Sequence, residues 1–412
     1  MDVIYEVCCG LDVHKRSVTA CLRMRGPKGE RRGAVRTFGT MTRELLELSA
    51  WLTSARCTHV AMASTGVYWR PVWHILEGSF ELLLVNARHV KMVPGRKTDV
   101  TDCEWIAQLL EHGLLRKSFV PEAPMRELRE LTRYRKILIE ERAREANRVQ
   151  KILETANIKL GDVATDVLGV SGRAMIEAMI AGERDTARMA ELAKRNLRKK
   201  REALRDALAG RFTEHHGFLL RQVLRHVDFL GEQIAEYDRR IEETMRPFAK
   251  AIEQLDTIPG VGRRAAEQIV AELGVDMNRF PTAAHAASWT GICPGNNESA
   301  GKRRSGTTPK GNRWLRTALV ECAKGAVRKK DCYFRAQYHH VARRRGGKRA
   351  TVAVAHSILV AAYHVLRDGT PYRDLGPRHF DTLQHDRLTR YHLRRLRDLG
   401  YPLELKPKEA AA

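Results

Sequence analysis

One stretch of this chain repeats its apolar residues at intervals that alternate between three and four. The repeat comprises Leu220, Val223, Val227, Leu230, Ile234, Tyr237 and Ile241. Such spacing brings all of these residues to one face of a helix and is typical of a coiled-coil seam. An earlier segment, at about 125–160, has looser matching positions at Leu128, Leu131, Leu138, Val149, Ile152 and Ala156. The two segments predict long helices that pair as an antiparallel hairpin or form the stalk of a dimer, and Pro247 interrupts the seam.

The first 115 or so residues have a different pattern, in which short apolar runs are separated by turns. Residues 3–13 form a nearly unbroken apolar run, as expected for a strand buried on both faces. The pattern predicts further strands at 18–24, 34–38, 59–62 and 80–85, and helices at 43–52, after Trp69 and at 100–110. Three antiparallel strands followed by alternating helices and strands match the order of a ribonuclease H-like fold.

At 412 residues the chain exceeds what one hydrophobic core usually serves, so we expect several domains. The pattern predicts an α/β domain at 1–120, a helical coiled-coil region at 121–250, a mainly helical region at 251–350, and a C-terminal helix with a basic tail at 351–412. The predicted fold class is therefore α/β plus α.

The chain is strongly basic, with 73 Lys and Arg against 49 Asp and Glu and a formal net charge of +24. Residues 302–349 alone contain sixteen cations and two acids. Another basic run at 194–201, which we expect on a helix face, lies between the two predicted long helices. This excess predicts a polyanionic partner, DNA or RNA, that is bound with strong salt dependence. The alternative for the basic segments is a solvated surface.

The same sequence argues against several other classes of protein. The longest apolar segment, at about 350–366, contains two histidines and is short for a membrane span, and Met1 leads directly into a strand-like segment without a secretory signal. The eight cysteines include no CxxC pair, which argues against a zinc ribbon and predicts free buried thiols. We therefore expect a cytoplasmic protein with no membrane partner.

Three aspartates are candidate metal ligands. Asp12 lies at the end of the first predicted strand, in GLDVHK, at the carboxyl edge where sites in α/β folds assemble. Asp99 and Asp102, in GRKTDVTD, are spaced to share one face of a helix. The alternatives are a solvated strand end for Asp12 and ordinary helix capping for the other two. Taken together in a basic protein, the three carboxylates predict a site for Mg²⁺, which prefers oxygen ligands.

Two motifs in the second half of the chain suggest contact with nucleic acid. Gly260 and Gly262 lie in IPGVG before a predicted helix, as in a helix-hairpin-helix, where backbone N–H groups can approach a phosphate; the alternative is a simple tight turn. Ser299, in NNESAGKRR, has small neighbours and is followed by cations, so it is either a nucleophile for phosphate or an ordinary loop serine. The nearby cations expected to contact phosphates are Lys302, Arg303, Arg304, Lys310, Arg313 and Arg316.

Six sequence blocks in this order resemble one family. They are GLDVHK, STGVYWRPV, GRKTDVTDCEWIAQLL, IPGVG, FPTAAHAASWTGICPGNNESAGKRRSG and KGNRWLRTALVECA, and with the helical middle they cover most of residues 5–370. The chain resembles the DEDD (RuvC-like) insertion-sequence transposases related to the Piv DNA invertases, a family of bridge-RNA-guided recombinases. Each block alone is weak, but six in order are specific.

The resemblance implies a RuvC-like domain with four acidic positions that bind Mg²⁺, a coiled-coil insertion, and a transposase domain with a nucleophilic serine. Asp12 matches the first acid, Asp99 the third, Asp102 the fourth and Ser299 the nucleophile. The resemblance further implies that the serine forms a covalent link to DNA, that a structured non-coding RNA pairs with donor and target DNA, and that dimers assemble into a tetramer with composite sites. It also places the protein at the bacterial nucleoid.

One position departs from the family pattern. The second acid should be a glutamate, but Ala63 occupies its place in AMASTG. Ala63 indicates either a deliberately inactivated protein or a natural copy that has decayed, and the intactness of the other blocks favours the first. The leading hypothesis is thus an RNA-guided recombinase impaired at one metal ligand. The alternatives are a RuvC-like structure-specific nuclease and a non-catalytic scaffold that binds nucleic acid.

Overall fold

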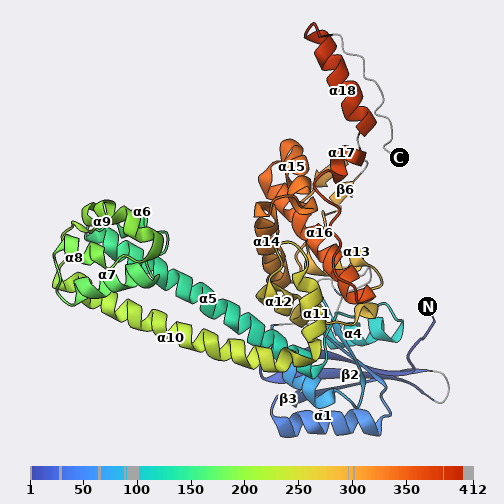
Figure 1. Cartoon of the computed structure of the whole chain (residues 1–412). Coiled ribbons are helices and arrows are strands. Elements are labelled where there is room, and N and C mark those ends of the chain that lie inside the picture. The colour runs from blue at the N-terminus through green and yellow to red at the C-terminus, as the bar shows by residue number, and fades with distance from the viewer. Residues whose placement is uncertain are drawn as a thin grey trace. The chain divides into compact units, whose positions relative to one another are not determined.

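A computed structural model of the chain has two compact units, Met1–Pro121 and Glu122–Ala412 (Figure 1). The structure describes residues 2–26, 30–63, 66–87, 90, 102–295, 297–299, 302–383 and 385–401. The regions predicted at 121–250, 251–350 and 351–412 all fall within the second unit.

The first unit is built on a five-stranded mixed sheet. Its elements are β1 (Val7–Val13), β2 (Ser17–Arg25), β3 (Arg31–Gly39), α1 (Thr42–Ser54), β4 (His59–Ala63), α2 (Trp69–Leu76), β5 (Glu81–Val85) and α4 (Asp102–Glu111). The strand order is β3-β2-β1-β4-β5, with antiparallel pairing from β3 to β1 and parallel pairing from β1 to β5. The predicted α/β character of this region is confirmed, and each of the predicted strands is present.

Both faces of this sheet are covered, which explains the unbroken apolar run in β1. Cys9, Leu11 and Val13 point to one face and pack with the buried leucines of α1 and α2. The alternate side chains point to the other face, where Cys8 packs in a cluster with the aromatic and aliphatic residues of α4, including Trp105. The sheet is therefore the middle of three layers.

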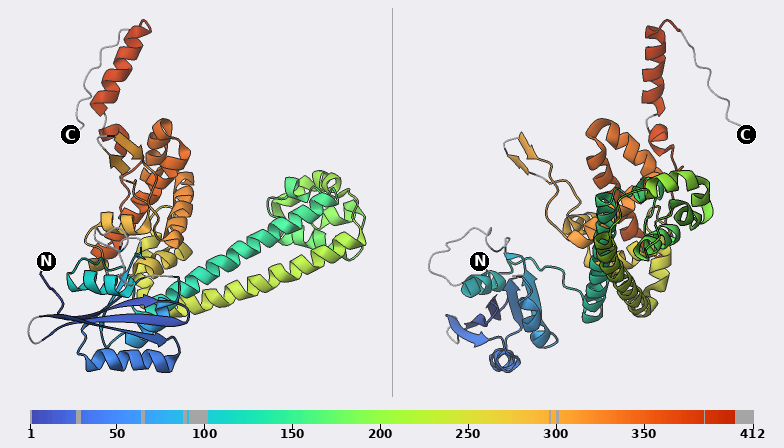
Figure 2. Two further views of the ribbon diagram at one scale, coloured as in Figure 1. Left: turned by 180° about the vertical axis from the view of Figure 1, so that it is seen from behind. Right: turned by 90° about the vertical axis from the view of Figure 1, so that its left-hand side faces the viewer.

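The second unit begins with a long helical hairpin. Its elements are α5 (Ala123–Thr155), α6 (Leu160–Val163), α7 (Val170–Ile180), α8 (Thr186–Glu191), the 3₁₀ helix η1 (Arg195–Lys200), α9 (Arg201–Leu208) and α10 (Glu214–Met245). Helices α5 and α10 lie side by side along their length, and α6 to α9 form a small bundle at the far end (Figure 2). The sequence allowed either an antiparallel hairpin or the stalk of a dimer, and the structure has the antiparallel hairpin within one chain.

The heptad seam holds this hairpin together. Leu220, Val227, Leu230, Ile234 and Ile241 are buried. Val223 and Tyr237 are partly exposed, and the Tyr237 ring stacks on Tyr134 of α5 with 5.2 Å between the ring centroids. The helical turn at Arg246–Phe248 ends the seam where Pro247 was expected to interrupt it.

The rest of the second unit is mainly helical. Its elements are α11 (Ala249–Asp256), α12 (Arg263–Leu273), α13 (Ala283–Thr290), β6 (Asn297–Ser299), β7 (Lys302–Ser305), α14 (Arg313–Arg328), α15 (Tyr333–Arg345), α16 (Gly347–Asp368), α17 (His379–Leu383) and α18 (His385–Asp398), with short 3₁₀ turns at Arg246–Phe248 and Met277–Arg279. Helix α16 is, within the described residues, the one helix apolar and long enough to cross a membrane. It packs against α11, α13, α14 and α15, which accounts for its apolar character as that of a core helix.

Candidate functional site

The structure places two of the predicted site residues beside each other on neighbouring strands. Strands β1 and β4 are parallel, and Leu11 is the register partner of Met62. The next residue along each strand is Asp12 in β1 and Ala63, the last residue of β4. The first and second expected acidic positions therefore occupy adjacent places at the carboxyl edge of the sheet.

Asp12 and Ala63 also share one face of the sheet. Side chains alternate along a strand, so Asp12 points to the same face as Cys8, which packs beneath α4. In β4, Ala61 is buried in that cluster and Ala63 packs against its edge. Both positions therefore lie on the face that α4 covers.

Gly10 allows α4 to approach this face closely. A Cβ atom at Gly10 would lie 2.9 Å from the Cα of Ala107 and closer still to the carbonyl oxygen of Cys103. Side-chain atoms of ordinary residues do not tolerate such contacts. This glycine was not predicted to have a role, although its place two residues before Asp12 in a buried strand was a signal.

The direction of α4 brings a third predicted residue to the same edge. Gly10 lies under Cys103, whereas Cys8, nearer the start of β1, has its Sγ 3.8 Å from the carbonyl oxygen of Ala107. Helix α4 therefore runs opposite to β1 and begins at the carboxyl edge of the sheet, where its first residue is Asp102. Asp12, Ala63 and Asp102 thus converge on one edge and one face.

The other end of α4 is fixed by a buried ion pair. Glu111, the last residue of the helix, is 4% exposed and accepts a hydrogen bond of 2.8 Å from Nε of Arg23 in β2. Arg31 of β3 adds a second guanidinium at 3.5 Å. Because a buried carboxylate is stable only when it is paired, these contacts hold α4 in one position over the sheet.

The chemistry of this edge fits a hard cation. The Asp12 side chain is 28% exposed, and its Oδ2 lies 3.0 Å from Nε2 of His14, another residue that the sequence analysis did not assign. Carboxylate oxygens at a strand end and a helix start are ligands that Mg²⁺ prefers. Asp99 lies outside the described residues, and Ala63 offers no ligand. Within the described parts of the chain, no group of three or more His, Cys, Asp or Glu residues could hold a metal.

Ser299 ends the first strand of a separate two-stranded ribbon in the second unit. Strands β6 and β7 are antiparallel, and Ser299 is the register partner of Lys302, whose side chain is exposed. The ribbon stands out from the helices of its own unit in the right-hand view of Figure 2. Arg303 and Arg304 follow in β7, and their side chains, like that of Ser299, are outside the described part.

The IPGVG segment lies in the turn between α11 and α12. Gly260 has φ +86°, and a Cβ there would collide with the backbone of α14 at Cys322 and Ala326. This glycine therefore serves a close packing contact. Gly262 is exposed at the start of α12, and a Cβ there would meet nothing within 4 Å, so no packing contact requires a glycine at this position.

The predicted cations near α14 have different surroundings. Lys310 and Arg313 are exposed, and the Arg313 guanidinium lies 5.0 Å from the ring centroid of Trp314. Arg316 is half-buried, and its Nη1 donates to the carbonyl oxygen of Gly291 at 3.2 Å. Lys310 and Arg313 are thus available to a phosphate, whereas Arg316 already supports the preceding loop.

A buried polar cluster, here the basal clasp, fixes the start of α14 to the base of the hairpin. It consists of Arg129, Arg133, Glu272 and Asn312. Glu272 is completely buried, and its two carboxylate oxygens accept hydrogen bonds of 2.7 and 2.8 Å from Arg133 of α5. The Asn312 amide donates to the same carboxylate at 2.6 Å, while its oxygen caps the first turn of α14.

Arg129 completes the basal clasp from α5. Its Nε donates to the carbonyl oxygen of Ala271 at 2.8 Å, and its guanidinium lies 5.7 Å from the ring centroid of Trp289. Burial lowers the pKa of Arg129 to about 10, and the neighbouring Glu272 carboxylate opposes that shift. The clasp joins residues more than a hundred positions apart in the chain and orients the helix that carries Arg313.

Comparison with known proteins supplies a family for this arrangement. Residues 9–158 match a transposase model for the DEDD domain of IS110 elements, and residues 252–339 match the model of the IS116/IS110/IS902 transposase family. An uncharacterized 43.6 kDa protein of insertion element IS110 from Streptomyces coelicolor is 33% identical over 125 residues. That stretch is 30% of this chain and 30% of the relative, so the similarity spans under a third of either protein.

Proposed function

Because both transposase domains are present and together span more than half of its length, the chain belongs to the IS110 family of transposases, and we propose that it cuts and rejoins DNA during transposition of an insertion sequence. The observation that carries this proposal is the convergence of Asp12, Ala63 and Asp102 on one edge of the sheet. That edge lies within the segment matched by the DEDD transposase model.

The acidic edge is the proposed metal site. Asp12, Asp99 and Asp102 would hold a divalent cation, which we propose is Mg²⁺, and His14 would keep the Asp12 carboxylate oriented. When bound, the cation would stabilise the charge that develops on phosphodiester oxygens. The order of the strands is compatible with the proposed RNase H or RuvC-like fold of this unit.

Ser299 is the proposed nucleophile. Its hydroxyl would lose its proton as the oxygen forms a bond to the phosphorus of a DNA phosphodiester. The bond from phosphorus to one deoxyribose oxygen would break, and that oxygen would take up a proton. The place of Ser299 opposite the exposed Lys302 supports this role, because a nearby cation stabilises the developing negative charge. Rejoining would reverse the step with a second DNA strand.

The remaining partners follow from the resemblance of the sequence blocks. We propose that a structured non-coding RNA pairs with donor and target DNA, and that dimers assemble into a tetramer in which sites are shared between subunits. The heptad seam is used within the hairpin, so it gives no separate support for a dimer. The excess of cations at 302–349 supports nucleic-acid binding in general.

Ala63 supports a second candidate function, a non-catalytic scaffold that binds nucleic acid. The residue lies where a fourth carboxylate would complete the metal site, and alanine has no ligand atom. Loss of one ligand should weaken metal binding or rate by at least the roughly 10- to 100-fold that changes around metal ligands cause. The two candidate functions predict different effects of introducing a carboxylate at position 63. A recombinase should regain strand exchange, whereas a scaffold should not.

The test compares Ala63→Glu with the matched control Ala63→Gln. Both side chains have nearly the same size, but only glutamate supplies a charged ligand. We expect Ala63→Glu to bind Mg²⁺ more tightly in calorimetry and to give Mg²⁺-dependent strand exchange with donor DNA, target DNA and guide RNA, while Ala63→Gln does neither. If the glutamate variant binds no more Mg²⁺ and stays inert, the assigned metal site is wrong.

Ser299→Ala in the Ala63→Glu background separates recombinase from nuclease. The recombinase requires a covalent adduct between protein and DNA, detectable after denaturation, and the serine substitution should abolish it. Undiminished cleavage by the double variant would instead identify a RuvC-like nuclease that uses water.

A further inference from the structure

The bundle at the end of the hairpin lies outside both matched transposase segments. The matches stop at residue 158 and resume at residue 252, and α6 to α9 fall between them. The bundle packs on the ends of α5 and α10 in one hydrophobic cluster, which includes the buried Leu160, Met175, Ile176 and Leu204. Neither matched transposase segment accounts for this module.

Five exposed cations gather on this bundle, and we name them the tip cations. They are Lys194, Arg195, Arg198, Lys199 and Lys200. None of the five pairs with a carboxylate in the part of the chain that the structure describes; Lys200 donates to the carbonyl oxygen of Val163 at 3.2 Å. The basic run predicted from the sequence is therefore a surface whose charge is uncompensated.

Other cations of the same bundle are compensated. Arg173 pairs with Asp228 at 2.6 Å and with Glu177, and Arg188 lies 3.5 Å from Asp185. Arg201, directly after the tip cations, pairs with Glu191 at 2.8 Å. Carboxylates are thus available nearby, and the tip cations are the ones left without them.

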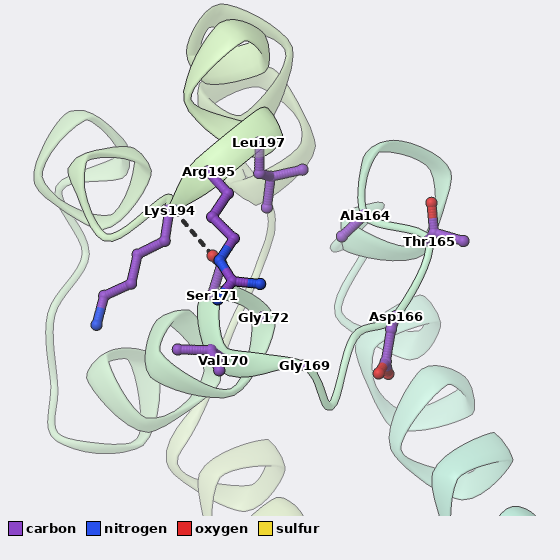
Figure 3. A pocket seen from close by; sticks show the side chains of 10 residues that line it. All are labelled: Ala164, Thr165, Asp166, Gly169, Val170, Ser171, Gly172, Lys194, Arg195 and Leu197. Carbon is purple, nitrogen blue, oxygen red and sulfur yellow. Dashed lines mark hydrogen bonds between the residues drawn. The ribbon is translucent and has the colours of Figure 1, made fainter.

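Two of the tip cations border a cavity of about 410 Å³. Its walls include Lys194 and Arg195 on one side and the first turn of α7, from Gly169 to Gly172, on the other. The backbone N–H of Lys194 donates to the Ser171 hydroxyl at 2.9 Å, which fixes the two walls to each other. Figure 3 shows the Arg195 side chain reaching toward the start of α7. Asp166 also lines the cavity, and its carboxylate accepts a hydrogen bond of 3.0 Å from the backbone N–H of Leu168.

The local backbone presents these cations as a group. Arg195 has φ +52°, an uncommon left-handed conformation that begins η1. Arg195, Arg198, Lys199 and Lys200 all lie within η1, so they form a short row of cations along this element. Such a row matches a linear polyanion better than a single small anion.

From these observations we propose that the tip cations and the adjoining cavity bind the phosphodiester backbone of duplex DNA. This inference rests on the proposed transposase function, which supplies DNA as the polyanion. The row would lie along one strand, and the cavity beside Arg195 would receive a phosphate from it. Because the contacts involve charge and backbone alone, binding here would be independent of sequence and would extend the DNA footprint beyond the acidic edge and Ser299.

The test uses the full chain and a labelled 30-base-pair duplex that contains no element sequence, so it needs no cleavage and stays informative if the proposed chemistry fails. The tip variant neutralises three cations as Arg195→Gln, Arg198→Gln and Lys199→Gln. The matched control removes the same charge from cations of the hairpin that pair with carboxylates, as Arg148→Gln, Lys159→Gln and Arg188→Gln.

We expect the tip variant to bind the duplex about tenfold or more weakly at 0.1 M salt, with the slope of log K against log salt reduced by about 2 to 3. The control variant should lose much less affinity for the duplex. The variant with Arg195→Lys and Arg198→Lys should bind as the original chain does, because the charge is kept. Thermal unfolding of each variant confirms that the fold is retained. Equal losses in the tip variant and the control, or a loss seen with an RNA duplex but not with DNA, would overturn the proposal.

Discussion

Replacing Gly10 by alanine should separate α4 from the sheet and thereby loosen the acidic edge. The new Cβ would lie 2.9 Å from the Cα of Ala107 and nearer still to the Cys103 carbonyl oxygen. Ordinary carbon contacts are about 3.5 to 4.0 Å, so α4 would have to retreat by about 1 Å. Helix α4 is buried along most of its length, and a gap of that size forfeits about a quarter to a half of each affected contact.

The expected cost follows from two opposing effects. Overpacking of this kind destabilises by about 1 to 3 kcal/mol. Alanine also lowers the conformational entropy of the unfolded chain, which stabilises the folded state by about 0.4 to 1 kcal/mol. We therefore expect a net loss of about 1.3 kcal/mol in the first unit, which corresponds to a fall of about 4 to 8 °C in its Tm.

Gly33→Ala is the matched control for this experiment. Gly33 lies in the edge strand β3 of the same sheet, and a Cβ there meets nothing within 4 Å. Calorimetry should show a lower Tm for Gly10→Ala and an unchanged or slightly higher one for Gly33→Ala. Hydrogen exchange of peptides from α4 should become faster only in the first variant. If the two variants unfold within about 0.5 kcal/mol of each other, the close approach does not limit the fold.

Three further outcomes are expected. Glu272→Gln should lower the free energy of unfolding, measured in urea, by about 3 to 5 kcal/mol, because it leaves buried guanidinium groups without a carboxylate. The control Glu321→Gln, which breaks the exposed pair with Lys136, should lower it by under about 1 kcal/mol. Equal losses in the two variants would contradict this prediction. Burial raises the pKa of the Cys57 and Cys322 thiols from 9.0 to about 12. The folded chain therefore keeps protons that the unfolded chain releases, so stability should fall as the pH rises from about 9 toward 12, and Cys57→Ala with Cys322→Ala should flatten that fall. Iodoacetamide should label the native chain at Cys293 alone, since this thiol is half-buried and the other seven are buried; peptide mapping that finds a second site would contradict the packing.

Much of the fold could be predicted because the decisive signals are local. The heptad seam of α10 and the apolar run of β1 depend on residues close in sequence, and both helix and strand lie where they were expected. The hairpin could not be chosen over a dimer stalk, because a seam specifies a partner helix but not the chain that supplies it. The basic run at 194–201 was expected on a helix face, and the structure has a 3₁₀ turn there followed by the start of α9.

The candidate site was predictable only where it follows from strand polarity. Asp12 was expected at a carboxyl edge because it ends a buried strand, and the structure has it there. The supporting Gly10 was not assigned, because its role depends on a helix that lies some ninety residues later in the sequence. His14 was not assigned either, although its contact with Asp12 is local. The basal clasp was equally hidden, since Arg133 and Glu272 are 139 positions apart. Ser299 was considered as a loop residue, whereas the structure places it in β6.

The basal clasp also affects the position of the bundle at the far end of the hairpin, because it holds the base of α5. Helix α5 has 33 residues and is therefore about 50 Å long. An arm of that length converts a tilt of about 10° at its base into a sweep of about 9 Å at its end, which exceeds the axial rise of two base pairs. If a change at the base, such as the loss of the Glu272 carboxylate, tilted α5 by that angle, the tip cations would move by more than the spacing of the phosphates that they are proposed to bind.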